Sequence, residues 1–189
     1  MIKRIGFLLI GVSVMWILNT IINNKKEDII EKNNINMFFE KEEVDNTKIY
    51  TSPNEYLMIL EIPKINLKKG LYSIESLKNN VNQNLEIINS SNMPDIENGN
   101  LVIAGHSGTS DVSYFRYLYK LVINDYCYIY YNGKKYTYKI VNIYNEEKNG
   151  KITIHKDNGI RTITLITCTL NNDKMQTVYI GNLVNIESY

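Results

Sequence analysis

The chain of 189 residues has few cysteines, histidines and prolines, and no excess of either charge. Its two cysteines, Cys127 and Cys168, and its two histidines, His106 and His155, are too widely separated for a zinc-ligand pattern. Three prolines and ten glycines are too few for a disordered chain. A formal net charge of +1 argues against nucleic acid as a partner. The sequence therefore predicts no metal, no other cofactor and no nucleic-acid binding.

Apolar and aromatic residues are abundant instead, at 44% hydrophobic residues with fifteen tyrosines, which suits one domain with one core. The clearest local pattern is a hairpin in which strands 126–131 and 134–143 flank Asn132-Gly133, a pair suited to a type I′ turn. Further predicted elements are short strands at 101–104, 162–167 and 176–180 and short helices near 73–81 and 114–121. This pattern predicts an all-β barrel or sandwich.

The N-terminus has a different composition. Residues 5–22 form an uncharged, mostly apolar run of 18 residues, close to the length that crosses a bilayer as a helix. No small-residue cleavage site follows, so we expect an uncleaved transmembrane anchor and not a signal peptide. Residues 23–51 are rich in Asn, Lys and Glu, which suggests a partly helical stalk before a domain at 52–189. The alternative for the apolar run is a buried core helix.

Two residues with catalytic chemistry each end a β-like segment. Cys168 lies in the apolar run 165–169, and His106 ends the Ala-Gly-His turn at 104–106, which is 62 residues earlier. A cysteine attacks as the thiolate, and a free pKa of about 8.5 leaves little thiolate at neutral pH unless a base or a cation is near. The two side chains are candidates for a nucleophile and base pair if the fold brings them together. The alternatives are a cysteine that only packs, which is the prediction for Cys127, and a disulfide between the two cysteines.

The segments that contain both residues resemble the sortase family. Residues 164–168, Thr-Leu-Ile-Thr-Cys, are similar to the strand that carries the family's cysteine, and residues 104–106 are similar to its Ala-Gly-His turn. Residues 56–65, with Ile-Pro-Lys-Ile, resemble the family's opening strand, and residues 114–118 resemble its aromatic segment after the histidine. The order and spacing match from about residue 56 to residue 184. The resemblance implies a closed β-barrel of about eight strands with short helices.

The resemblance also implies a function, that of a membrane-anchored cysteine transpeptidase of a Gram-positive-type cell envelope. Residues 1–4 would be cytoplasmic and the catalytic domain extracellular, with residues 5–22 in the lipid bilayer. Cys168 would attack the threonine carbonyl of a sorting signal similar to Leu-Pro-x-Thr-Gly and form a thioester. His106 would protonate the leaving amine and then assist an amino nucleophile from a peptidoglycan precursor or a pilin lysine.

One position departs from the family pattern. Sortases carry an arginine on the strand after the cysteine, five residues before a small residue, and counting back from Gly181 gives Gln176. The chain has three arginines, none of them on this strand: Arg4, Arg116 and Arg161. Glutamine can donate hydrogen bonds but carries no charge.

Three explanations of this departure remain open. The protein is an impaired or specialised sortase, another cation substitutes for the arginine, or the register is wrong. Lys174 is the candidate substitute, because it lies two residues from Gln176 and would share its face of the strand. Arg116 and Arg161 are further candidates. The alternative functions are a catalytically weak module that binds sorting-signal peptides or assists a partner, and a purely structural tethered domain.

Other polar residues carry no motif. His155 lies in a polar stretch and is predicted to be a surface residue. Some sortases bind calcium through acids in the barrel loops, and Glu146, Glu147 and Asp157 are present here. Such charges usually belong to solvated surface, so no metal site is assigned.

Overall fold

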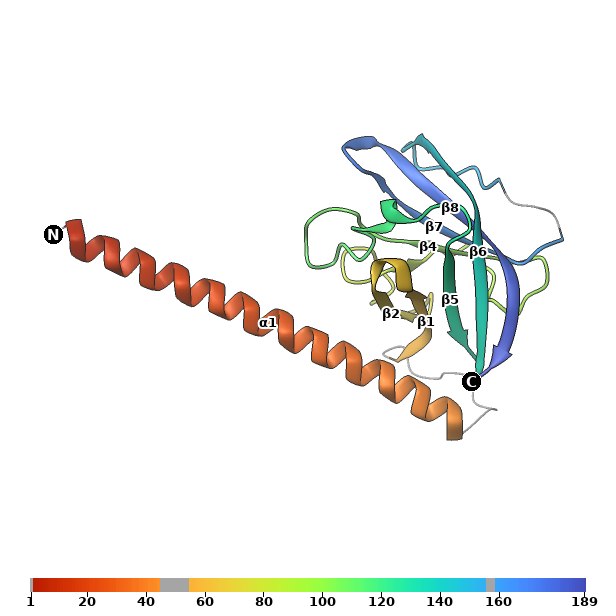
Figure 1. The fold of residues 1–189 in the computed structure, drawn as a ribbon, viewed down its shortest axis with the longest axis horizontal. Coiled ribbons are helices and arrows are strands. Elements are labelled where there is room, and N and C mark those ends of the chain that lie inside the picture. Colours follow the sequence, from red (N-terminus) through yellow and green to blue (C-terminus); the bar gives the residue numbers. More distant parts are fainter. Residues whose placement is uncertain (1, 45–54, 156–158) are drawn as a thin grey trace.

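The fold is given by a computed structural model that describes residues 2–44, 55–155 and 159–189 (Figure 1). One long helix precedes a sheet of eight strands. In chain order the elements are α1 (Ile2–Val44), β1 (Tyr56–Ile62), the 3-10 helix η1 (Pro63–Ile65), β2 (Leu67–Tyr72), β3 (Glu86–Ile87), β4 (Asn100–Ala104), the 3-10 helix η2 (Leu118–Lys120), β5 (Tyr126–Tyr131), β6 (Lys134–Glu147), β7 (Thr162–Thr169) and β8 (Asn172–Ser188).

The sheet curls into a nearly closed barrel, which confirms the predicted all-β fold. Its strand order is β2-β1-β5-β6-β8-β7-β4-β3, so β2 and β3 are the two edges. The side chain of Asn84, just before β3, bridges the edges by donating its amide to the carbonyl of Gly70 in β2 at 2.8 Å. Asn79 pairs with β3 in the same way, because its amide group donates to the carbonyl of Ile87 and accepts from its N–H. A side-chain hydrogen bond thus links the two edges of the sheet, β2 and β3, which are not paired through their backbones.

The barrel interior is filled by alternating strand residues, as half-buried strands require. Its fully buried members include Met58, Leu60, Ile62, Leu71, Ile103, Ile129, Tyr138, Ile163 and Leu165. Cys127 belongs to this cluster with no exposed surface, so its predicted packing role agrees with its position. Burial raises the pKa of the Cys127 thiol to about 12, because the interior cannot solvate a thiolate.

The predicted hairpin is confirmed, since β5 and β6 pair in antiparallel fashion across Asn132 and Gly133, both at positive φ (50° and 66°). Of the two predicted short helices, the one at 73–81 is wrong and the one at 114–121 is shorter than predicted. Residues 73–81 form turns, in which the Ser76 hydroxyl accepts from the Lys78 N–H and offers the backbone an alternative to helical bonds. Within residues 114–121 residues 114–117 form turns, and a short 3-10 helix, η2, follows at Leu118–Lys120.

Helix α1 is continuous through most of the predicted anchor and stalk, and its C-terminal part packs beside β1 and β2 (Figure 1). Ile35 and Phe38 form an apolar cluster with Tyr56, Ile59 and Tyr72. In the part of the chain that the structure describes, no helix is long and apolar enough to cross a membrane. The predicted boundary between the stalk and the domain, at residues 51–52, lies outside the described residues.

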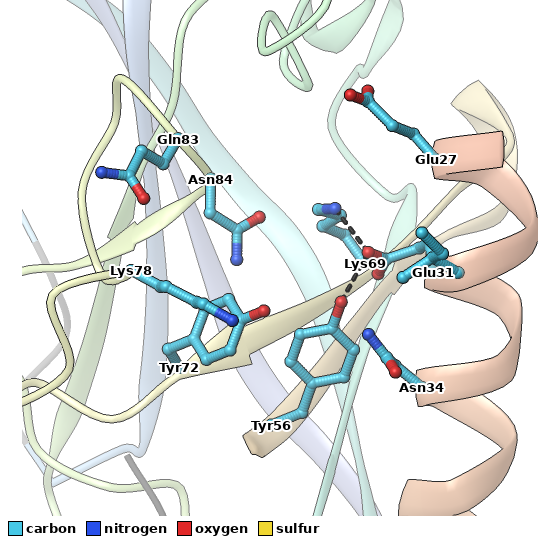
Figure 2. A pocket seen from close by; sticks show the side chains of 10 residues that line it. Glu27, Glu31, Asn34, Tyr56, Lys69, Tyr72, Lys78, Gln83 and Asn84 are labelled. Carbon is cyan, nitrogen blue, oxygen red and sulfur yellow. Dashed lines mark hydrogen bonds and ion pairs between the residues drawn. The ribbon is translucent and has the colours of Figure 1, made fainter. Parts of the chain in front are cut away.

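Beside this contact, Glu31 of α1 is the main polar link to the barrel. Its carboxylate accepts hydrogen bonds from the Tyr56 hydroxyl at 2.5 Å, the Lys69 ammonium at 2.6 Å and the Gly70 N–H at 3.0 Å (Figure 2). A cavity of about 200 Å³ lies here between helix and barrel, lined by Glu27, Ile30, Glu31, Asn34, Tyr56, Lys69, Tyr72, Lys78, Gln83 and Asn84. The helix is therefore held by a polar network as well as by its apolar side chains.

Candidate active site

The only parallel pair among the described strands, β4 and β7, brings His106 and Cys168 to the same end of two neighbouring strands. Ala104 at the end of β4 is paired with Ile166 in β7. His106 and Cys168 each follow these paired residues by two positions, so they lie level with each other at the carboxyl ends of neighbouring strands. The sequence alone could not establish this pairing, because it depends on which strands are neighbours.

Three hydrogen bonds fasten the His106 turn to the Cys168 segment. The Gly105 N–H donates to the carbonyl of Ile166 at 3.1 Å, and the Thr167 hydroxyl donates to the carbonyl of Gly105 at 2.7 Å. The Ser107 hydroxyl donates to the carbonyl of Cys168 at 2.9 Å. The residues on both sides of His106 are thereby tied to β7, which fixes the histidine backbone relative to the cysteine.

The His106 ring is half-buried and has a partner on the far side of the turn. Its Nε2 lies 3.3 Å from Oδ1 of Asn82. An amide oxygen only accepts, so Nε2 carries the proton when this hydrogen bond forms, and Nδ1 is then the unprotonated nitrogen of the neutral ring. Asn82 therefore favours the tautomer of the neutral ring in which Nδ1 is the nitrogen that can accept a proton.

Cys168 is a half-buried free thiol, and Cys127 is also free, so the disulfide alternative is wrong. The ammonium of Lys148 donates a hydrogen bond to Sγ of Cys168 at 3.4 Å. Lys148 follows β6, and its N–H donates to the carbonyl of Lys174 at 2.8 Å, which extends the pairing of β6 with β8 by one residue. Lys148 was not predicted from the sequence, because only this strand pairing brings it to the cysteine.

Gln176 lies in β8, between Cys168 of β7 and the end of β6. In the sheet it is directly opposite Cys168 of β7 on one side and Glu146 of β6 on the other. Its amide nitrogen donates to Oε1 of Glu146 and to the carbonyl of Lys151, each at 3.2 Å, and only 8% of the residue is exposed. Both amide hydrogens are therefore used to hold the segment that follows β6.

The other cations considered from the sequence lie elsewhere. Lys174 is exposed, as Lys148 is, but within the described part of the chain its ammonium makes no hydrogen bond to the cysteine sulfur. Arg116 donates to the carbonyls of Gly108 at 3.0 Å and Ser110 at 2.8 Å. Arg161 lies 4.0 Å from the carboxylate of Glu97. The structure thus brings Lys148, not these residues, to the thiol.

An apolar surface on the outside of the barrel leads to Cys168. Ile166 lies two residues before the cysteine and so on the same face of β7. It packs with other buried residues of this face, Val102, Val178 and Ile180, and with the partly buried Ile88, Tyr144 and Ile154.

The segment at 151–155 covers one side of this surface. The Tyr144 hydroxyl donates to the carbonyl of Thr153 at 2.5 Å, and the Thr153 N–H donates to the Glu146 carboxylate at 3.2 Å. The exposed His155 ring packs edge-on against Tyr144 at 4.9 Å between centroids. Glu146 is thus engaged within this segment, and Asp157 lies outside the described residues.

A thiol in contact with a cation, with a histidine at the same end of the neighbouring strand, is an arrangement suited to nucleophilic acyl transfer. Residues 60–184 match the family model of the sortase domain, and the chain therefore belongs to the sortase family. Membership of this family supports cysteine transpeptidase activity.

Solved structures agree in fold. A sortase D5 transpeptidase of Clostridium perfringens matches with a TM-score of 0.67 and 24% identity over 82% of this chain and 99% of that chain. Sortase E1 of Streptomyces coelicolor, solved with a tripeptide in the active site, matches with a TM-score of 0.60 and 26% identity over 74% and 94%. Sortase C of Streptococcus pneumoniae, described with regard to pilin substrate specificity, matches with a TM-score of 0.62 and 22% identity over 73% and 74%. No curated protein gives a significant match.

Proposed function

We propose that the protein is a membrane-anchored sortase that cleaves a sorting signal similar to Leu-Pro-x-Thr-Gly and transfers the acyl group to an amine. The observation that carries the proposal is the parallel pairing of β4 with β7, because His106 and Cys168 each follow a paired residue by two positions at the same end of these strands. Family membership supports the same chemistry.

In the first step the thiol proton of Cys168 passes to His106, and the sulfur forms a bond to the threonine carbonyl carbon. The tetrahedral intermediate collapses with loss of the amine, which takes a proton from His106 and leaves a thioester on Cys168. In the second step an amino nucleophile gives a proton to His106 and attacks the thioester. A new amide forms, and the thiol is restored. A peptidoglycan precursor and a pilin lysine are the two acceptor classes.

The apolar outer surface beside the cysteine is suited to the leucine and proline side chains of such a signal. Ile166, Val178 and Ile180 are its buried base, and the partly buried Ile88, Tyr144 and Ile154 are the members that such side chains would contact. A peptide along β7 would present its threonine carbonyl to Sγ.

For the N-terminus we propose residues 1–4 as the cytoplasmic end, residues 5–22 as the bilayer anchor, residues 23–51 as the stalk and residues 52–189 as the extracellular catalytic domain. The uncharged composition of residues 5–22 supports this assignment. Alkaline carbonate extraction of cell membranes tests it. The full chain is expected in the membrane pellet and a chain lacking residues 1–22 in the supernatant, and an equal distribution of the two would exclude the anchor.

The function is tested by intact-mass spectrometry of the full chain in detergent, mixed with a panel of Leu-Pro-x-Thr-Gly-like peptides. We expect a mass increase equal to the peptide up to threonine, reversed by hydroxylamine and absent in Cys168→Ala. A protein that retains a reactive thiol but gives no adduct with any peptide would contradict the proposal.

A second candidate is a catalytically weak module that binds sorting-signal peptides or assists a partner. It is favoured by Gln176, which stands at the arginine position of the family pattern and has its amide engaged by Glu146 and Lys151. Isothermal calorimetry with the same peptides distinguishes the two. Saturable binding without any adduct supports the weak module, and adduct formation at a catalytic rate excludes it.

A further inference from the structure

The Cys168 sulfur has a cationic neighbour that the family pattern does not predict. Lys148 donates from its ammonium to Sγ at 3.4 Å, within hydrogen-bond range for sulfur. The residue directly opposite Cys168 on β8 is the neutral Gln176. In this chain a charge therefore reaches the thiol from the residue that follows β6, and Gln176 on the neighbouring strand β8 supplies none.

The position of Lys148 is fixed by contacts on both sides of it in the sequence. Its own N–H donates to the carbonyl of Lys174 at 2.8 Å. Gln176 binds Glu146, two residues before Lys148, and the carbonyl of Lys151, three residues after it, each at 3.2 Å. A primary amide has two hydrogens, and here each has one acceptor. Gln176 thus clamps the turn from which the lysine side chain extends.

We propose that Lys148 is a catalytic residue that supplies the positive charge for Cys168, and that Gln176 is a positioning residue that holds the Lys148 turn. A cation beside a cysteine favours the thiolate, which is the attacking species. When the sulfur bonds to a carbonyl carbon, the carbonyl electrons move onto its oxygen, and the ammonium beside the sulfur would donate a hydrogen bond to that oxygen. Lys148 keeps its proton throughout, and the thiol proton goes to His106.

The other charged and titratable groups around the thiol come from three elements. His106 follows β4, Glu146 and Glu147 end β6 and are followed by Lys151, and Asp173 and Lys174 lie at the start of β8. Glu146 is hydrogen-bonded to Gln176, and Lys174 is exposed. Because Lys174 lies opposite Lys148 in the strand pairing, it is the matched control for a general effect of positive charge near Cys168.

The thiolate part of the proposal is tested without any peptide, by the pH dependence of iodoacetamide alkylation at Cys168 in the full chain, read by peptide mapping. Lys148→Met is expected to slow alkylation at pH 7 by about tenfold. Lys148→Arg is expected to retain most of the rate, and Lys174→Met to leave it unchanged. A Lys148→Met profile that coincides with wild type, with circular dichroism unchanged, would overturn the proposal.

A double-mutant cycle tests the role of Gln176. If it acts through Lys148, Gln176→Ala shifts the alkylation profile in the wild-type background and adds nothing to Lys148→Met. Additive shifts would show that Gln176 affects the thiol independently, and would overturn its assignment as a positioning residue.

The oxyanion part rests on the proposed function and is measured separately, as the single-turnover rate of thioester formation with peptide. Lys148→Met is expected to lower this rate by about 100-fold, as loss of an oxyanion donor does. If wild type forms no thioester but its alkylation profile depends on Lys148, the proposed function fails and the thiolate role stands. If wild type forms the thioester and Lys148→Met forms it equally fast, the catalytic role of Lys148 fails and the proposed function stands.

Discussion

Gly105 allows the close approach that places His106. A methyl group added there would lie 2.4 Å from Cδ2 of Leu85 and 2.9 Å from Cδ2 of Phe115. Since both neighbours are fully buried, Gly105→Ala is expected to displace the turn, lower stability by about 1 to 3 kcal/mol and slow acylation. Thermal unfolding and single-turnover acylation measure the two effects.

The matched control is Gly108→Ala in the same loop, where the added methyl group meets only the Ser113 hydroxyl at 3.5 Å. It is expected to leave both stability and rate close to wild type. Equal behaviour of the two variants would show that the approach at Gly105 does not constrain the histidine.

The two cysteines are expected to differ in reactivity. Cys168 is half-buried and contacts a cation, whereas Cys127 has no exposed surface and a thiol pKa raised to about 12 by burial. Titration of the folded protein with a disulfide reagent at pH 8 should therefore release one equivalent rapidly, and a second only after denaturation. Two rapid equivalents, or labelling of Cys127 first, would contradict the burial of that thiol.

For single residues, local motifs were enough to select His106 and Cys168 as candidates, because each ends a recognisable apolar run. Lys148 was not predicted. It lies 20 residues from Cys168 in the sequence and approaches it only through the order β6-β8-β7 of the sheet. The same register shows Gln176 facing Glu146, a contact that no local pattern predicts. Residues that act across strands need the strand order.

At the scale of elements, the contact of α1 with the barrel depends on Glu31. Glu31→Ala removes the acceptor of Tyr56, Lys69 and the Gly70 N–H, and is expected to destabilise the docked helix by about 1 to 3 kcal/mol. The helix segment should then be cleaved faster in limited proteolysis, while the barrel remains intact.

Glu27→Ala is the control, because Glu27 lines the same cavity one helical turn away and points away from this network (Figure 2). Its proteolysis should match wild type. If Glu31→Ala were cleaved no faster than Glu27→Ala, the apolar cluster of Ile35 and Phe38 alone would account for docking.

Elements with a strong local signal were predicted correctly. The Asn132-Gly133 turn fixed the β5-β6 hairpin, since both residues tolerate positive φ. The helix predicted at 73–81 was wrong, because the Ser76 hydroxyl accepts the Lys78 N–H that a helix there would need. Of the helix predicted at 114–121, only the 3-10 helix η2 forms. The two-residue strand β3 was not predicted, and it depends on Asn79 and Asn84, whose side chains bond to distant backbone groups.

For the whole molecule, the barrel core contains groups that must stay protonated, and this predicts a loss of stability at alkaline pH. Burial raises the pKa of Cys127 from 9.0 and that of Tyr179 from 10.0, each to about 12, and also raises the pKa of Tyr138. At a pH between a group's ordinary pKa and its raised pKa in the folded protein, the unfolded chain has released a proton that the folded chain still holds. The unfolded state then binds fewer protons, so the free energy of unfolding falls as pH rises.

The stabilising effect is thus fully present below about pH 9 and is lost towards pH 12, with each group contributing a slope of about 1.4 kcal/mol per pH unit in its own window. Denaturant unfolding measured between pH 8 and 11 gives this slope. Tyr179→Phe should make it shallower above pH 10, because the group no longer titrates, whereas Tyr126→Phe, at an exposed position, should not. A free energy of unfolding independent of pH over this range would show that the barrel admits ionised side chains, and that its interior is less dry than the packing of Cys127 and Tyr138 requires.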